Sequence, residues 1–125
     1  MMTNIQITPN ADEVQLEFKF QSLDEFSYKF EIVNCDTGDR HMTGQGSWNG
    51  QTLFILGKGS DLLGLCLNIA WGELDPTGGT GDFSATATAS QNGNVCQVVQ
   101  SFTGKSTGNI VNGLTQAKFI KTQPA

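Results

Sequence analysis

The fold class is indicated first by the stretch Val14-Gln15-Leu16-Glu17-Phe18-Lys19-Phe20. In this stretch, polar residues separate the apolar ones at every second position. Residues 26–32, with the sequence FSYKFEI, repeat this alternation. Successive side chains of a β-strand point to opposite faces, so each stretch turns one face to a core and the other to water. The residues between them, 21–25, have the length of a hairpin loop. We therefore expect these two strands to pair as an antiparallel hairpin.

Alternation and turn signals continue along the rest of the chain. Residues 84–90 alternate Ser or Thr with Ala. Residues 34–39 and 91–94 are rich in the Asn, Asp and Gly that favour turns. Asn49-Gly50 predicts a type I′ hairpin turn between the runs on either side of it.

The whole pattern predicts an all-β protein. Strand-like runs recur about every 8–12 residues, as in barrels and sandwiches, and no segment has a helical period. We expect eight to nine strands, folded as a single antiparallel β-barrel or β-sandwich domain over residues 1–125. Either arrangement satisfies the alternation, so the sequence leaves this choice open.

Residues 62–71, with the sequence LLGLCLNIAW, form the most apolar run and are apolar on both faces. Such a run fits a central strand, which is covered on both sides. It also fits a strand whose outer face meets another subunit, which would make the protein a homo-oligomer.

The charge of the chain excludes some classes of partner. Seven Lys and Arg against twelve Asp and Glu give a net charge of −5, and no basic stripe is present. An acidic surface repels phosphate backbones and anionic lipids, so we expect neither nucleic-acid binding nor electrostatic membrane docking. No apolar span is long enough for a transmembrane segment, and residues 1–9 lack the pattern of a signal peptide. We expect a soluble protein that is cytoplasmic or non-classically secreted.

The cysteines and acidic turns predict no metal or cofactor. Cys35, Cys66 and Cys96 form no C-x-x-C pair, so zinc is not expected. We expect three buried thiols that act as small apolar groups, with one disulfide and a free thiol as the alternative. Counting from Asp36 or Asp75, neither acidic turn reproduces the twelve-residue calcium loop.

No catalytic residue is predicted either. Residues 104–108, GKSTG, match the G-x-S-x-G pattern of a nucleophile elbow, which needs a following helix and a later His. The chain contains one His, His41, and it lies before this segment.

Residues 77–87, TGGTGDFSATA, resemble a segment of the allene oxide cyclase and dirigent-type β-barrels. This resemblance implies an eight-stranded, calycin-like barrel with an apolar cavity. Ala85 stands where that family usually has Gly. An enzyme of this type needs an inward-pointing carboxylate or tyrosine, and Tyr28 and Glu31 are the nearest candidates.

Two tryptophans at strand ends suggest a binding site. Trp48 precedes the Asn49-Gly50 turn, and Trp71 lies where an apolar run enters a Gly-rich segment with Glu73 and Asp75. Aromatic side chains at strand ends stack on sugars or line a ligand site, and they also cap cores. The first hypothesis is a non-enzymatic binding protein that recognises a small ligand, glycan or protein partner through loops at one end. Its ligand-binding residues would be Trp48, Asn49, Trp71, Glu73 and Asp75.

Two other classes of function stay open. One is a cyclase- or isomerase-like barrel enzyme with an apolar cavity. The other is a self-associating structural or toxin-like protein, with residues 62–71 as its interface.

Overall fold

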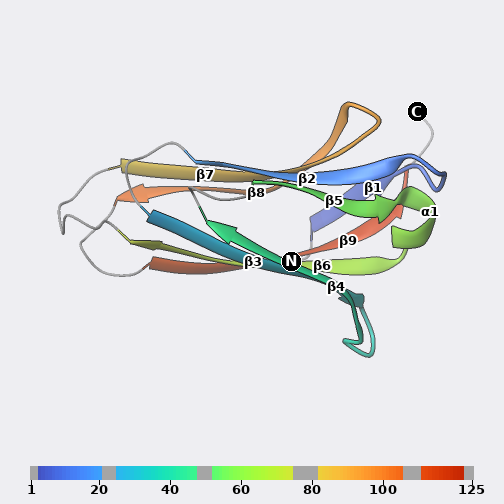
Figure 1. Cartoon of the computed structure of the whole chain (residues 1–125), viewed down its shortest axis with the longest axis horizontal. Coiled ribbons are helices and arrows are strands. Elements are labelled where there is room, and N and C mark those ends of the chain that lie inside the picture. Colours follow the sequence, from blue (N-terminus) through green and yellow to red (C-terminus); the bar gives the residue numbers. More distant parts are fainter. Residues whose placement is uncertain (1–2, 21–24, 48–51, 75–81, 106–110, 123–125) are drawn as a thin grey trace.

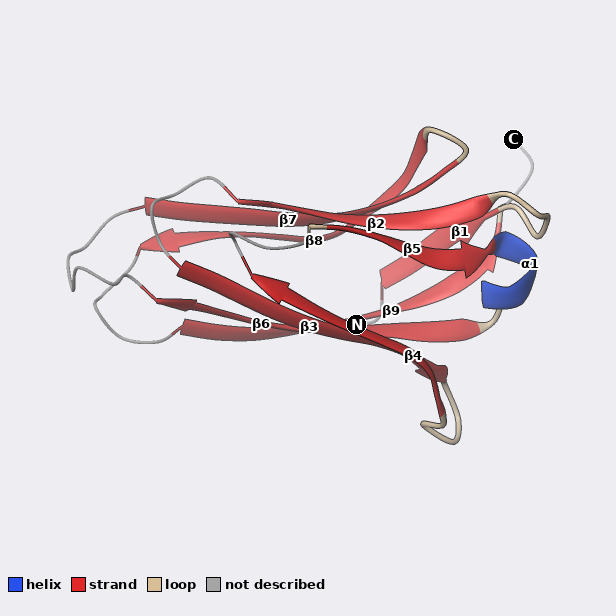
Figure 2. Cartoon of the chain, in the orientation of Figure 1, coloured by secondary structure: helices blue, strands red, loops and turns tan. Residues whose placement is uncertain are grey.

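The computed structural model describes residues 3–20, 25–47, 52–74, 82–105 and 111–122, and its regular elements are nearly all strands (Figure 2). The elements are β1 (Thr3–Ile7), β2 (Glu13–Phe20), β3 (Glu25–Asn34), β4 (Arg40–Ser47), β5 (Leu53–Lys58), α1 (Gly59–Leu62), β6 (Leu65–Leu74), β7 (Asp82–Gln91), β8 (Asn94–Lys105) and β9 (Val111–Lys121).

Two sheets stacked face to face form a β-sandwich, with no closed barrel (Figure 1). One sheet has five strands in the order β1-β9-β6-β3-β4, and the other has four in the order β5-β2-β7-β8. All neighbouring strands are antiparallel except β1 and β9, which are parallel. The prediction of an all-β fold with eight to nine strands is confirmed.

Consecutive strands often belong to different sheets. In each of the pairs β2/β3, β4/β5, β6/β7 and β8/β9, one strand lies in the four-stranded sheet and the other in the five-stranded sheet. The hairpin predicted between residues 14–20 and 26–32 is therefore wrong, and so is the one predicted at Asn49-Gly50. A strand with one apolar face and a short polar connection has the same sequence pattern in two cases. It can pair with the next strand in one sheet, or it can pack face to face against the next strand from the opposite sheet.

The two other predicted turns do join paired strands. Between β3 and β4, the Asn34 side-chain oxygen accepts hydrogen bonds from the backbone N–H groups of Asp36 and Thr37 at 2.9 and 3.1 Å. Between β7 and β8, Asn92 and Gly93 have φ angles of 52° and 77°. Positive φ at both central residues is the requirement of a type I′ turn.

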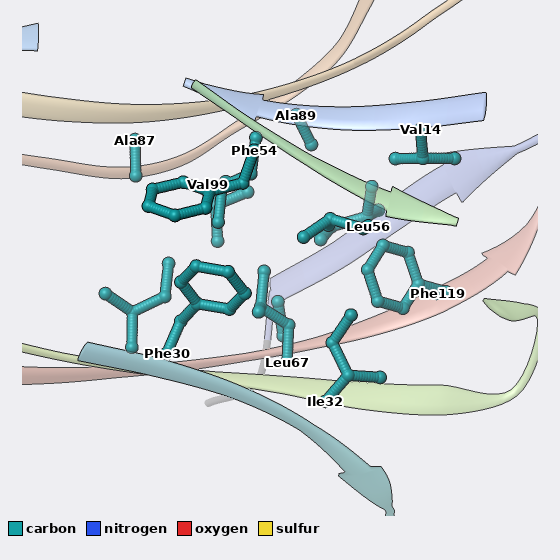
Figure 3. Close-up of a cluster of buried hydrophobic side chains, with 14 of the residues drawn as sticks. Val14, Phe30, Ile32, Phe54, Leu56, Leu67, Ala87, Ala89, Val99 and Phe119 are labelled. Carbon is teal, nitrogen blue, oxygen red and sulfur yellow. The ribbon is translucent and has the colours of Figure 1, made fainter. Parts of the chain in front are cut away.

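The core fills the space between the sheets (Figure 3). The alanines of β7 are buried beside large residues of β2, with Ala87 opposite Phe18 and Ala89 opposite Leu16. Small side chains on one strand thus make room for large ones on the next. The ring of Phe18 stacks on Tyr28 at a centroid distance of 3.8 Å. Phe30 and Phe54 meet edge to face at 4.9 Å.

The apolar run 62–71 is not one strand. Leu62 ends α1, where it is buried, and β6 begins at Leu65 in the centre of the five-stranded sheet. The inward residues of β6 join the core, while Cys66, Asn68 and Ala70 lie on its outer face.

The cysteines match the alternative prediction of one disulfide and a free thiol. Cys35 and Cys66 form a disulfide, and Cys96 is a free, partly buried thiol. The prediction of three buried thiols is therefore wrong, because Cys35 directly follows the end of β3, which is paired there with the start of β6. No helix among the described residues is long and apolar enough to cross a membrane.

Candidate functional site

The antiparallel pairing brings several strand ends to one end of the sandwich. In the five-stranded sheet, the start of β3 lies opposite the end of β6 through Glu25 and Leu74. Ser27 of β3 pairs with Ser47, the last residue of β4, on one side, and with Gly72 of β6 on the other. Adjacent strands are about 4.8 Å apart, so Ser47 and Gly72 are about 10 Å apart across β3. We call this end, where β4 and β6 finish, the rim end.

Most residues of the predicted site belong to the rim end by chain position. Trp48 and Asn49 directly follow β4, Asp75 directly follows β6, and all three lie outside the described residues. The backbone of Glu73 pairs with Phe26 and Val111.

Trp71 is the one predicted site residue whose side chain the structure describes. It shares the inner face of β6 with Leu67 and Ile69, and it is partly buried against the core. Its backbone lies opposite Tyr28 on β3 and Gly113 on β9. Trp71 therefore covers the core near the rim end.

The two candidates for an enzyme lie on opposite sides of the five-stranded sheet. Tyr28 points inward, where it is buried and stacked on Phe18. Burial raises the pKa of its hydroxyl above the ordinary value of 10.0. Glu31 is on the outer face, where its carboxylate forms an ion pair with Arg40.

A groove of about 650 Å³ crosses the outer face of the five-stranded sheet. Lys29 and Glu31 of β3 line it, and so do Asn68 and Ala70 of β6. The strand register places these residues in two rows of four, which run from β4 across β3 and β6 to β9. The rows are Gln45–Lys29–Ala70–Leu114 and Thr43–Glu31–Asn68–Gln116.

The groove continues towards the rim end. A second hollow of about 620 Å³ shares Lys29, Gln45 and Ala70 with the first and reaches Ser47 and Gly72. These last two residues adjoin the segments that carry the predicted site. The two hollows thus form one continuous groove, which we call the outer-face groove and which reaches the rim end.

The carboxylate of Glu31 is fixed at the middle of this groove. Its Oε2 lies 3.2 Å from Nε of Arg40, and its Oε1 accepts a hydrogen bond of 3.3 Å from Nδ2 of Asn68. Two partners from two flanking strands hold the group in one orientation. Among the described residues, no ion pair or hydrogen bond engages the exposed ammonium group of Lys29.

The far end of the groove is bounded by the β3–β4 turn, which projects away from both sheets (Figure 2). A bulge between Ile32 and Val33 shifts the pairing of β3 with β4 at this point. The disulfide from Cys35 to Cys66 ties the turn to β6. The groove therefore lies between this turn and the rim end.

The sequence did not identify the outer-face groove as a site. The alternation already placed Lys29 and Glu31 on the solvent side of a strand. The turn predicted at residues 34–39 favoured β4 as one neighbour of β3, but the sequence gave no sign that β6, which comes from a non-consecutive part of the chain, would be the other.

No protein-family model, curated protein or solved structure matches the chain. Within the described part of the chain, no three His, Cys, Asp or Glu side chains gather into a set that could hold a metal ion.

Proposed function

We propose that this protein is a non-enzymatic β-sandwich binding module that recognises a small ligand, glycan or protein partner at the rim end. Trp48, Asn49, Trp71, Glu73 and Asp75 are its proposed ligand-binding residues. The observation that supports this proposal is the strand register, which puts Ser47 and Gly72 on either side of Ser27. Ser47, where β4 ends, thus lies about 10 Å from Gly72, which is two residues before the end of β6.

The chemistry of these residues suits recognition. Tryptophan offers a large apolar face and one N–H donor, and carboxylates accept hydrogen bonds from hydroxyl or amide groups. Binding sites commonly combine an aromatic surface with a few polar groups of this kind. The sheet supplies a rigid base for a site of this kind.

The experiment is a ligand screen followed by substitution at the rim end. A glycan array and a thermal-shift panel of small molecules should give at least one ligand that stabilises the protein. Trp48→Ala should then lower the affinity for that ligand at least tenfold, while Val95→Ala leaves it unchanged. Val95 is a suitable control because it is 67% exposed on β8, beside the β7–β8 turn and away from the rim end.

Other outcomes would overturn the proposal. Conversion of a bound ligand into a product, seen by mass spectrometry, would make the protein an enzyme. A concentration-dependent oligomer in light scattering, with no ligand found, would favour self-association. An affinity that Trp48→Ala does not change would remove the rim end from the site.

A further inference from the structure

The outer-face groove carries a local charge that differs from that of the whole chain. The protein has seven Lys and Arg against twelve Asp and Glu. Among the described residues that line the groove, Lys29 and Arg40 are cations and Glu31 is the carboxylate, and Lys118 of β9 is a further cation on the same face of the sheet. Asp36 and Asp39 lie in the projecting turn beyond them. A cationic strip on an acidic protein attracts an anionic ligand to this face.

The hydrogen-bonding groups of the groove suit a ligand with many hydroxyl groups. Amide side chains both donate and accept, and Gln45 and Gln116 are exposed on this face. The Glu31 carboxylate has acceptor positions beyond those used by Arg40 and Asn68. Because these two partners fix its orientation before a ligand arrives, a hydroxyl group would meet an ordered acceptor.

The floor of the groove is apolar and open. Ala70 is exposed at its centre, and the adjacent Leu114 is 79% exposed. A sugar ring has an apolar C–H face with hydroxyls around its edge, which matches a small apolar floor between polar side chains. The four strands from β4 to β9 span about 14 Å, which leaves room for a short chain of sugars.

Together, the free ammonium of Lys29, the fixed carboxylate of Glu31 and the apolar floor point to an oligosaccharide that bears carboxylate groups as the ligand of the outer-face groove. Lys29 pairs with the ligand carboxylate, and Glu31 accepts from its hydroxyls. Arg40 donates its remaining N–H groups beyond the one that faces Glu31. This inference rests on the proposed function, since it names the class of ligand that the binding module takes.

An acidic peptide is the main rival ligand, and the groove favours it less. A polyhydroxylated ring is best bound by a row of side chains that donate and accept hydrogen bonds. A peptide that adds a strand to a sheet gains most of its affinity from backbone hydrogen bonds to a free strand edge. Here, the middle of the groove lies over β3 and β6, interior strands whose edges are already paired, and the edge strand β4 lies at its border.

The experiment measures binding of defined acidic sugars by isothermal titration calorimetry. The probes are oligogalacturonate, oligomannuronate and sialyllactose, with methyl-esterified oligogalacturonate and a poly-glutamate peptide as comparisons. At least one carboxylated sugar should bind, and esterification or added salt should weaken that binding. Lys29→Gln should lower the affinity about tenfold, the effect of losing one charge-assisted hydrogen bond.

Matched variants separate the local effect from a change in net charge. Lys58→Gln removes the same charge from an exposed position on β5 in the other sheet, and it should leave the affinity unchanged. Gln45→Glu places a carboxylate opposite Lys29 in the strand register, so it should weaken binding as much as Lys29→Gln does. These positions are exposed, so the variants should keep the unfolding temperature of the parent protein.

The outcomes distinguish this inference from the proposed function. Failure of all carboxylated sugars to bind, or tighter binding of poly-glutamate, overturns the assignment of the ligand. A ligand whose affinity falls with Trp48→Ala but not with Lys29→Gln also overturns it, while the binding function at the rim end stands. Loss of affinity in Lys29→Gln and Gln45→Glu, but not in Lys58→Gln, supports it.

Discussion

Removal of the Cys35–Cys66 disulfide tests whether the projecting β3–β4 turn is held by a covalent link. The two cysteines are 31 residues apart in sequence. In the chain-entropy account of disulfides, a closed loop of this length stabilises the folded state by about 3.7 kcal/mol. A loss of this size is a large part of the 5–15 kcal/mol that is typical of the free energy of unfolding of a small protein.

Cys35→Ser is the appropriate variant. Cys35 is exposed, whereas Cys66 is 1% exposed. Replacement of Cys66 by Ser would therefore bury a hydroxyl group in the sheet. The assay is urea unfolding without reductant, followed by fluorescence. With a urea dependence of about 2 kcal/mol per molar, the midpoint should fall by about 2 M. Cys96→Ser is the matched control, because Cys96 is the free thiol and its replacement leaves the link intact.

Two results would refute this reasoning. The first is an unfolding midpoint of Cys35→Ser equal to that of the parent protein under oxidising conditions. The second is a count of three reactive thiols, rather than one, when the unreduced parent is unfolded in the presence of a thiol reagent.

A reducing agent provides a further check. It should lower the unfolding midpoint of the parent protein and leave the midpoint of Cys35→Ser unchanged.

Two further predictions concern the core. An added Cβ at Gly44 would collide with ring atoms Cε1 and Cζ of the buried Phe30, so Gly44→Ala should lower the free energy of unfolding by about 1–3 kcal/mol. The outward-facing Thr43→Ala is its control in thermal unfolding, and equal stability of the two variants would contradict the packing. Burial raises the pKa of the hydroxyl of Tyr28, so above the ordinary pKa of 10.0 the unfolded chain loses this proton first. The free energy of unfolding should therefore fall as the pH rises past that value, and Tyr28→Phe should remove this dependence. Because Tyr28 is the single tyrosine, an absorbance titration reads it alone, and a midpoint at or below 10.0 would contradict its burial.

The positions of strands were largely predictable from the sequence, and their partners were not. Alternation correctly placed β2, β3 and β7, because burial of one face leaves a period of two in any sheet. The Asn92-Gly93 turn was also correct, since its positive φ angles are a local property. The Asn49-Gly50 signal failed as a hairpin because β4 pairs with β3 and β5 pairs with β2.

The candidate site was predictable only in part. Trp48 and Trp71 were singled out because the sequence indicates strand ends near them, and their role in binding stays a prediction. The outer-face groove depends on which strands flank β3, and the pairing of β3 with β6 joins distant segments. Lys29 and Glu31 were recognisable as outward-facing, but nothing in the sequence placed Ala70 beside Lys29.

The pattern of residues alone predicts short strands with one apolar face each and indicates which side chains turn inward. The crossing of consecutive strands between two sheets, the contact of Cys35 with Cys66 and the polar groove on the five-stranded sheet became visible in the folded chain. This difference arises because the inward or outward direction of a side chain is a local property of the backbone. The choice of partner strand depends instead on how all the apolar faces are buried together, as when Leu16 and Phe18 of β2 fit against the alanines of β7.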